Sequence, residues 1–339
     1  MTPHRYWPVA ALAMDPRLTA DLLGEKQWRR LNGIVQVPDR SPILDFHANA
    51  LHHLGLVEVL LTGWGCPRVD GRTLHLMPRL RLIAHTGSSV KPIVTDELWH
   101  RGILVSSAAA ANAIPVAEFA LAAILFANKG VFRSREETRR LRGFKSHPWV
   151  APGSDGNLGA VVGIVGFSRT GRRLVQLLAS FDLDVLVYDP IAKPAEIAAL
   201  GARQASLQEL FDQAGVVSLH APSLPETHGL VSGSMLARLR DGATIINTAR
   251  GDLIDQDALE RELVSGRLFA VLDVTRPEPP PASSPLYELS NVFLTPHMAG
   301  AAGRETKRLA DLAIDEISRF IAGEPLAHQV TPQMLQSIG

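Results

Sequence analysis

Four side chains in the C-terminal half of the chain could together carry out an acid/base reaction on an anionic substrate. Arg250 stands in Asn-Thr-Ala-Arg-Gly-Asp, Glu278 in Arg-Pro-Glu-Pro and His297 in Thr-Pro-His. A histidine exchanges a proton near neutral pH, a neighbouring carboxylate fixes its tautomer, and an arginine grips a carboxylate through two parallel hydrogen bonds. Asp273 could accept hydrogen bonds from a carboxamide such as that of nicotinamide. This set fits hydride transfer on a hydroxy or keto acid.

Each of these residues also has a plain structural interpretation when it is taken alone. Arg-Gly-Asp is commonly a solvated loop, Pro-Glu-Pro commonly stiffens a connection, and a histidine after Thr-Pro is more often a surface residue than a catalyst. Their placement favours catalysis, because each follows closely on an apolar run that is typical of a strand. Ligands of an open parallel sheet bind outside the carboxyl ends of its strands, so the sequence predicts one shared site there.

Short apolar runs that alternate with helical segments predict the sheets that would carry these residues. In the last two thirds of the chain we expect strands at 161–165, 185–188, 216–219, 244–246, 270–272 and 292–294, and helices at 255–264 and 304–321. In the first third we expect strands at 57–61, 82–85 and 103–105, and helices from Ser41 to Gly55 and up to Gly102. A loop near 108–111 and one long helix over 115–142 connect the two parts. The predicted fold class is α/β, with two doubly wound domains.

A glycine-containing turn between a predicted strand and a predicted helix is the clearest ligand motif. In Gly166-Phe-Ser168-Arg169-Thr170-Gly171, the N–H groups at the helix N-terminus could bind a pyrophosphate. Ser168 stands where the dinucleotide fingerprint has a second glycine, and its Cβ would crowd the phosphate, although its hydroxyl could donate to a phosphate oxygen. A strand–helix turn without a ligand is the alternative interpretation.

The choice between NAD and NADP depends on Asp189, at the end of the next predicted strand. A carboxylate there accepts hydrogen bonds from an adenosine ribose and repels a 2′-phosphate, so NAD is favoured. Asp189-Pro190 is also a common turn pair, and both interpretations can hold together.

Composition and charge exclude several other classes of protein. The 339 residues contain 34 Lys plus Arg and 34 Asp plus Glu, and this zero net charge argues against nucleic-acid binding. The single cysteine, Cys66, cannot form an internal disulfide or a thiolate site, and the other histidines lack metal-ligand spacing, so no metal is expected. The apolar segment 108–127 is interrupted by polar residues and proline, and the N-terminus lacks an export signal. We therefore expect a soluble cytoplasmic protein that does not insert into a membrane.

The sequence resembles the D-isomer-specific 2-hydroxyacid dehydrogenases over nearly its whole length. The resemblance rests on VGIVGFSRTG (162–171), VYDP (187–190), VVSLHAPSLPETHGLV (216–231), INTARGDLID (246–255), LDVTRPEP (272–279) and LTPHMAG (294–300). It implies that Arg250 binds and orients the substrate, that His297 is the acid/base and that Glu278 supports it.

The resemblance also implies two binding regions and a domain arrangement. The backbone of Gly87, Ser88, Ser89 and Val90 would hold the substrate carboxylate, together with Arg250 and His297. NAD would contact Gly166, Ser168, Arg169, Thr170, Gly171, Asp189, Ala221, Pro222, Thr248, Ala249, Arg250, Asp273, His297 and Gly300. Residues 1–113 and 303–339 would form a flavodoxin-like substrate domain around a Rossmann NAD-binding domain of residues 114–302, with the active site in the cleft between them. A homodimer would form through the cofactor domain, using the apolar face of the 115–142 helix.

The predicted function is NAD-dependent interconversion of a small D-2-hydroxy acid and its 2-keto acid, with hydroxypyruvate, glyoxylate and phosphoglycerate as leading substrates. The sequence departs from the family at Ser168, at Lys91-Pro92, at Thr275 and at 108–111, and these departures concern affinity rather than reaction class. Glu278 argues against the formate dehydrogenases, which carry glutamine there. Candidates for substrate specificity are Trp64, Ser88, Ser89 and Trp149. The alternative is an NAD(H)-sensing regulatory protein, similar to the corepressors that share this fold.

Overall fold

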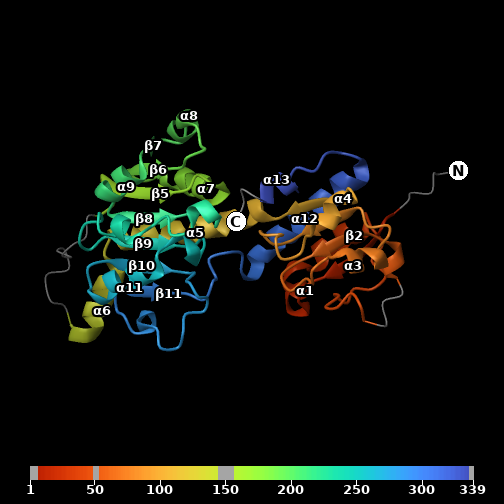
Figure 1. Ribbon diagram of the computed structural model, residues 1–339, viewed down its shortest axis with the longest axis horizontal. Coiled ribbons are helices and arrows are strands. Elements are labelled where there is room, and N and C mark those ends of the chain that lie inside the picture. Colours follow the sequence, from red (N-terminus) through yellow and green to blue (C-terminus); the bar gives the residue numbers. More distant parts are fainter. Residues whose placement is uncertain (1–6, 49–52, 144–155, 336–339) are drawn as a thin grey trace. The chain divides into compact units, whose positions relative to one another are not determined.

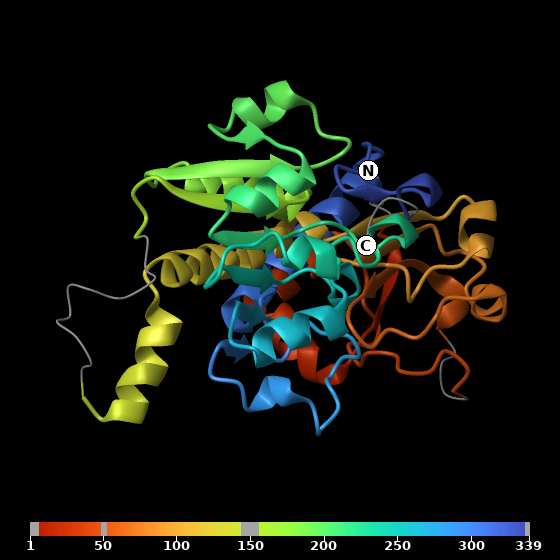
Figure 2. The same cartoon turned by 60° about the vertical axis from the view of Figure 1, so that its left-hand side comes forward.

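The structure, a computed structural model, describes residues 7–48, 53–143 and 156–335 (Figures 1 and 2). The described residues fall into two compact units. Unit 1 comprises the residues up to Asn112 and those from Ala301 onward, and unit 2 comprises Ala113–Gly300. The domain boundaries implied by the resemblance are 113/114 and 302/303. Each unit has its own sheet and its own core.

Unit 1 is built on a five-stranded sheet in the order β1-β2-β3-β4-β12. The strands are β1 (Val9–Ala13), β2 (Val57–Thr62), β3 (Leu82–His85), β4 (Leu104–Ser107) and β12 (Gln329–Val330). The first four are parallel, and β12 pairs antiparallel with β4. A parallel bridge places Gln36 on the free side of β1. When this position is counted as the second strand, the parallel order is 2-1-3-4-5, the flavodoxin-like order that the family resemblance implied.

Helices cover both faces of this sheet, and one of them comes from the C-terminal end of the chain. Helices α1 (Pro16–Leu22), α2 (Glu25–Asn32) and α12 (Thr306–Ala322) pack on one face, and α3 (Gly71–Leu76) and α4 (Asp96–His100) on the other. Leu309, Ala313 and Ile317 of α12 share a core with Leu22 and Leu31. A short helix, α13 (Pro332–Leu335), follows β12. The last long helix therefore completes the fold of the first third of the chain.

Unit 2 contains a parallel sheet of seven strands in the order β11-β10-β9-β8-β5-β6-β7. They are β5 (Ala160–Val165), β6 (Leu183–Tyr188), β7 (Arg203–Gln204), β8 (Val216–Leu219), β9 (Thr244–Asn247), β10 (Phe269–Leu272) and β11 (Val292–Leu294). The chain proceeds outward from β5 to β7 and then returns to β8 on the other side of β5. This reversal is the topological switch point at which doubly wound sheets bind ligands.

Helices also cover both faces of the second sheet. Helices α5 (Ala109–Asn128) and α7 (Arg169–Leu178) pack on one face, and α9 (Leu207–Gln213), α10 (Gly233–Leu236) and α11 (Gln256–Val264) on the other. Helix α8 (Pro194–Ala198) precedes β7. Alternate residues of one strand serve the two cores: Ile164 faces α5 and α7, and Val165 faces α9 and α11. The α/β fold class is confirmed.

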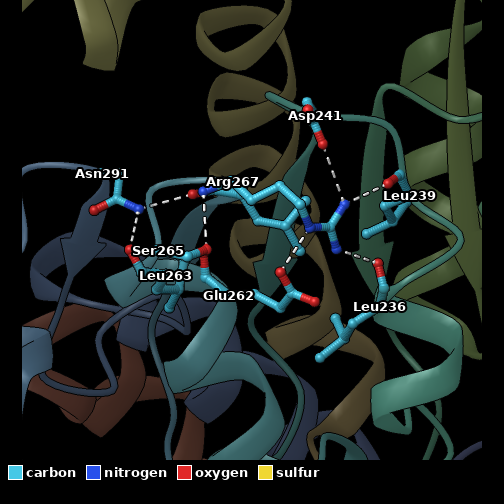
Figure 3. A network of polar contacts seen from close by, with 9 residues as sticks. Leu236, Leu239, Asp241, Glu262, Leu263, Ser265, Arg267 and Asn291 are labelled. Atoms are coloured by element: carbon cyan, nitrogen blue, oxygen red, sulfur yellow. Dashed lines mark hydrogen bonds and ion pairs between the residues drawn. The ribbon is translucent and has the colours of Figure 1, made fainter.

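Arg267, just before β10, makes polar contacts with other segments of unit 2 (Figure 3). Its Nη1 donates to the carbonyl of Leu239 at 2.6 Å, its Nη2 to that of Leu236 at 2.7 Å, and its Nε to the carboxylate of Glu262 at 2.6 Å. Carbonyls at the end of a helix such as α10 have no partner within the helix, so the guanidinium satisfies them. The hydrogen bond to Glu262 raises the pKa of Arg267 and lowers the pKa of that carboxyl. This network ties α10 and α11 to the strand that leads to Asp273.

Two expectations about helix bounds were wrong around residues 108–142. Helix α5 already begins at Ala109 and contains Pro115, because an alanine-rich stretch has the highest helix propensity and outweighs one proline. The predicted long helix is two helices, since Gly130 adopts a left-handed conformation (φ 65°) before α6 (Val131–Leu141). Among the described residues, α5 is long and apolar enough to cross a membrane. Its Ala117, Ala120 and Ile124 pack in the core of unit 2 instead.

The helix expected from Ser41 is also absent from the described residues 41–48, and residues 49–52 lie outside the description. Side chains compete with a helix there: the N–H of Ser41 donates to Asp39 Oδ1 and the N–H of His47 to Asp45 Oδ1. The N–H of Ile43 donates to the carbonyl of Leu12 at the end of β1. The segment is held as a loop against the sheet.

Candidate active site

A histidine–glutamate pair stands at the carboxyl end of the sheet in unit 2. His297 follows β11, Glu278 follows the adjacent β10, and Nδ1 of His297 lies 2.5 Å from Oε1 of Glu278. An ionised carboxylate only accepts hydrogen bonds, so we assign the ring proton to Nδ1, which donates a hydrogen bond to Glu278. The two side chains are 50% and 40% exposed, so Nε2 can receive a ligand. The structure brings together the predicted acid/base residue and its predicted support.

A buried carboxylate shapes the loop that carries His297. His297 has a left-handed backbone (φ 54°), which is uncommon outside glycine, and its N–H donates to the carbonyl of Asp273 at 2.9 Å. The carboxylate of Asp273 accepts hydrogen bonds from Thr295 Oγ1 (2.6 Å), Met298 N (2.8 Å) and Ala299 N (2.9 Å). Asp273 therefore holds the chain on both sides of His297. Sequence reasoning missed this role, because no local pattern shows which loop turns back toward an aspartate.

The Arg250 guanidinium has no carboxylate partner among the described residues; its Nη1 donates to the carbonyl of the adjacent Ala249 at 2.6 Å, and the residue is half-buried. The turn that carries it is shaped by Asn247, whose Nδ2 donates to the carbonyl of Arg250 and whose Oδ1 accepts from Ala249 N. A Cβ on Gly251 would lie 2.1 Å from the carbonyl oxygen of Thr275, so this turn packs directly against the segment that leads to Glu278. The arginine charge is thus available to an anionic ligand near the histidine–glutamate pair.

The turn between β5 and α7 has the close packing of a nucleotide-binding loop. A Cβ on Gly166 would lie 2.4 Å from Ala221 N, and a Cβ on Gly171 would lie 2.0 Å from the carbonyl oxygen of Gly166. Ser168 is accommodated because its backbone is extended (φ −63°, ψ −177°), which any residue adopts. Its Oγ accepts a hydrogen bond from Gly171 N at 3.3 Å and so caps α7. Arg169 and Thr170 form the first turn of this helix.

In unit 1, the segment Gly87–Val90 follows β3 and is anchored from below. Thr62 Oγ1 is 2.9 Å from Nδ1 of His85, and the carbonyl of Gly87 accepts a hydrogen bond from Ala108 N. A Cβ on Gly87 would lie 2.5 Å from Nε2 of His85, so only glycine fits. Burial lowers the pKa of His85 to about 4, which keeps this ring neutral.

The backbone of the same segment offers unused hydrogen-bond donors. Within the described part of the chain, the N–H groups of Ser88, Ser89 and Val90 form no hydrogen bond. Consecutive free N–H groups are a suitable receptor for an anion such as a carboxylate.

Comparison with known proteins assigns this arrangement to a family. The sequence model of the family described as "D-isomer specific 2-hydroxyacid dehydrogenase, NAD binding domain" matches residues 121–299, which is most of unit 2. The chain belongs to the D-isomer-specific 2-hydroxyacid dehydrogenase family. The resemblance inferred from the sequence motifs is confirmed, and the matched domain binds NAD.

Individual members of the family match most of the chain. The D-3-phosphoglycerate dehydrogenase of Mycobacterium tuberculosis is 34% identical over 324 residues, which are 94% of this chain and 57% of that protein. The chain therefore spans little more than half the length of that relative. The glyoxylate reductase of Korarchaeum cryptofilum is 31% identical over 258 residues, 76% of this chain and 77% of that protein. Among solved structures, the TT0316 protein of Thermus thermophilus has a TM-score of 0.75 and 30% identity and covers 95% of this chain and 100% of its own.

The residues of this dehydrogenase-family chain fit NAD at the switch point of the sheet. Asp189 follows β6 beside the glycine turn: its Oδ2 accepts from Phe167 N at 2.7 Å, and its Oδ1 accepts from Ile191 N and Ala192 N. It is thus a turn former, as the Asp-Pro pair predicted, and it also places a carboxylate next to the turn. A ribose hydroxyl could donate to this carboxylate, whereas a 2′-phosphate would be repelled.

A buried hydroxyl without a partner among the described residues lies just beyond the end of β9. Oγ1 of Thr248 is buried and has no hydrogen-bond partner among the described residues. Buried hydroxyls are normally paired, so an unpaired one at this edge indicates a polar ligand atom. Ala221 and Pro222 follow β8, where Ala221 packs beneath Gly166, and Gly300 ends unit 2 after the His297 loop. The remaining predicted cofactor residues thus lie on loops at the same edge of the sheet.

Proposed function

We propose that the protein is an NAD-dependent oxidoreductase that interconverts a small D-2-hydroxy acid and its 2-keto acid. The observation that carries this proposal is the 2.5 Å contact between His297 and Glu278 at the ligand-binding edge of an NAD-binding domain. A sensor needs the nucleotide site alone. An oriented acid/base pair is typical of a catalytic site when the same sheet edge also carries an arginine that has no carboxylate partner in the described part of the chain.

In the proposed reaction, the residues of this chain bind the acid and move one proton. During oxidation, Nε2 of His297 takes the proton of the C2 hydroxyl, and Glu278 stabilises the imidazolium that forms. In reduction, His297 returns this proton to the carbonyl oxygen. Arg250 binds the carboxylate or polarises the carbonyl, and the free N–H groups of Ser88 and Ser89 bind the carboxylate. The Gly166–Gly171 turn and Asp189 would hold NAD, which would supply the hydride chemistry at C2.

Turnover tests this proposal. We expect the purified protein to consume NADH in the presence of at least one 2-keto acid among glyoxylate, hydroxypyruvate, pyruvate and phenylpyruvate. His297→Ala should lower this rate at least a thousandfold while NADH binding persists. If the wild type binds NADH but reduces none of these acids, and His297→Ala binds NADH equally well, an NAD(H)-sensing protein would be favoured instead.

We further propose that two copies associate through α5, α6 and β11. Phe132 lies 6.0 Å from Phe126 and 5.2 Å from Phe293, measured between ring centres, and these two neighbours are 52% and 44% exposed. Exposed aromatic clusters of this kind mark protein interfaces. Light scattering of the intact protein should give twice the mass of one chain, and Phe126→Asp with Phe293→Asp should give a monomer. A wild-type monomer at micromolar concentration would contradict the dimer.

A further inference from the structure

The segment Gly63-Trp64-Gly65 forms a turn just beyond the carboxyl end of β2, and the turn is held by backbone hydrogen bonds. It carries one exposed aromatic residue, Trp64. The N–H of Gly63 donates to the carbonyl of Ala13, and the carbonyl of Trp64 accepts from Asp15 N at 2.8 Å. Gly65 has a left-handed conformation (φ 81°), and a Cβ there would lie 3.0 Å from Asp15 N. The turn is therefore held against the end of β1 and has little freedom to move.

This turn lies directly beside the free N–H groups of the Gly87–Val90 segment. In the register of the sheet, Thr62 of β2 is the partner of His85 of β3, and each strand ends there. A Cβ on Gly63 would lie 3.0 Å from Oγ1 of Thr86. Trp64 and Gly87 therefore occupy equivalent positions, two residues beyond a paired strand end. A ligand whose carboxylate is bound by Ser88 and Ser89 has its remaining atoms within reach of the turn.

The Trp64 side chain is 40% exposed, although unit 1 has a well-filled core. An exposed aromatic side chain offers an apolar surface to a ligand. Because the turn that carries it is already fixed in the free protein, ligand binding loses less conformational entropy there. No residue of the turn carries a charge.

The basic side chains nearest in sequence to these strand ends each lie near carboxylates. After β1, Arg17 pairs with Asp15 through a contact of 2.5 Å. After β2 and β3, Arg68 and Lys91 line one cavity together with the carboxylates of Asp70, Asp96 and Glu97. A phosphate carried on the substrate would therefore meet these cations among carboxylates, whose negative charge repels a phosphate.

We propose that Trp64 is a specificity-determining residue and that the substrate is a 2-keto or 2-hydroxy acid with an apolar or aromatic group beyond C2, rather than a phosphorylated acid. This inference rests on the proposed function and adds to it the class of substrate. The aromatic ring packs on the group attached to C2, while the Gly87–Val90 segment binds the carboxylate.

The test compares three acids with NADH: phenylpyruvate, 3-phosphohydroxypyruvate and glyoxylate. We expect kcat/KM for phenylpyruvate to exceed that for 3-phosphohydroxypyruvate at least tenfold, which corresponds to about 1.4 kcal/mol. Trp64→Ala should raise KM for phenylpyruvate at least tenfold and leave glyoxylate, which has no group beyond C2, within twofold. Trp64→Phe should restore most of the affinity. The retained glyoxylate activity also reports that the variant is folded.

Arg68→Gln is the matched control, because Arg68 lies on the same loop as Trp64. It should leave all three acids unchanged. A wild-type preference for 3-phosphohydroxypyruvate, a loss of that activity in Arg68→Gln, or an equal loss on all three acids in Trp64→Ala would each overturn the assignment. If no 2-keto acid is reduced by the wild type, the proposed function itself fails, and this outcome is distinguishable from a wrong substrate class.

Discussion

The backbone N–H of His297 donates to the carbonyl of Asp273 at 2.9 Å, while the side chain of the same aspartate accepts three hydrogen bonds from the residues around the histidine. The strained backbone of His297 (φ 54°) is thus maintained by Asp273, which directly follows the neighbouring strand β10. Left-handed non-glycine residues persist only where the surroundings determine them. The direction of the imidazole is consequently set by Asp273 as well as by Glu278.

This relationship predicts the effect of removing the Asp273 carboxylate. Asp273→Asn keeps one acceptor oxygen and places an amide N–H₂ against one of the loop donors, so the loop should lose its fixed geometry. We expect kcat to fall at least tenfold in steady-state assays. Asp273→Ala should cost more, including about 1–3 kcal/mol of folding stability, because buried donors lose their acceptor. Unchanged kcat in both variants would show that the loop keeps its geometry without this carboxylate.

Glu278 should matter for catalysis and hardly at all for stability. Both members of the Glu278–His297 pair are exposed, and exposed pairs contribute little to folding. Glu278→Gln should lower kcat by about a hundredfold, because the amide stabilises the imidazolium less well than a carboxylate. Thermal unfolding should shift by less than about 1 °C. A large loss of stability with little change in rate would reverse this assignment.

Arg267, in contrast, should matter for folding stability and hardly at all for cofactor binding. Its guanidinium is three-quarters buried and binds two carbonyls and Glu262. Arg267→Met therefore removes this donor from the Leu239 carbonyl and the Glu262 carboxylate, and one of two donors from the Leu236 carbonyl. We expect a loss of about 3 kcal/mol in urea unfolding, with KM for NADH unchanged in the protein that remains folded. Arg238→Met, which removes a more exposed pair with Asp212, is the control and should cost less than about 1 kcal/mol. Equal losses in the two variants would contradict a special role for Arg267.

Two buried histidines should make the protein less stable as the pH falls below neutral. Burial lowers the pKa of His85 from 6.5 to about 4 and that of His220 to about 3. Below pH 6.5 the unfolded chain binds protons at these positions and the folded chain does not, so the free energy of unfolding decreases with falling pH. Each histidine contributes a slope of up to about 1.4 kcal/mol per pH unit until its folded-state pKa is reached.

Urea titrations between pH 8 and pH 4.5 measure this slope. His220→Asn should reduce it, even if the variant is less stable throughout, because the slope depends on the number of titrating groups rather than on the absolute stability. His47→Asn, at an exposed position, is the control and should leave the slope unchanged. An identical slope in His220→Asn would show that this histidine is protonated in the folded protein.

Elements that depend on local chemistry could be predicted from the sequence. Apolar runs such as 216–219 form strands that are buried between two layers of helices. Asp255 and Ser168 cap the helices that follow them. The chemistry of Arg250, Glu278 and His297 was visible for the same reason: each stands just after such a strand, and parallel strands deliver their carboxyl ends to one edge.

The contacts between these residues, and the groups that support them, could not be predicted in the same way. The contact of Glu278 with His297, the hydrogen bonds of Asp273 to the loop 295–299 and the unpaired hydroxyl of Thr248 depend on how separate loops fold back. The short strand β7 and the bridge at Gln36 are likewise too brief to produce a pattern in the sequence. Local periodicity reports the direction in which a side chain points from its own strand. The neighbour that it meets is determined by packing between segments that are distant in the chain, and no local pattern encodes that packing.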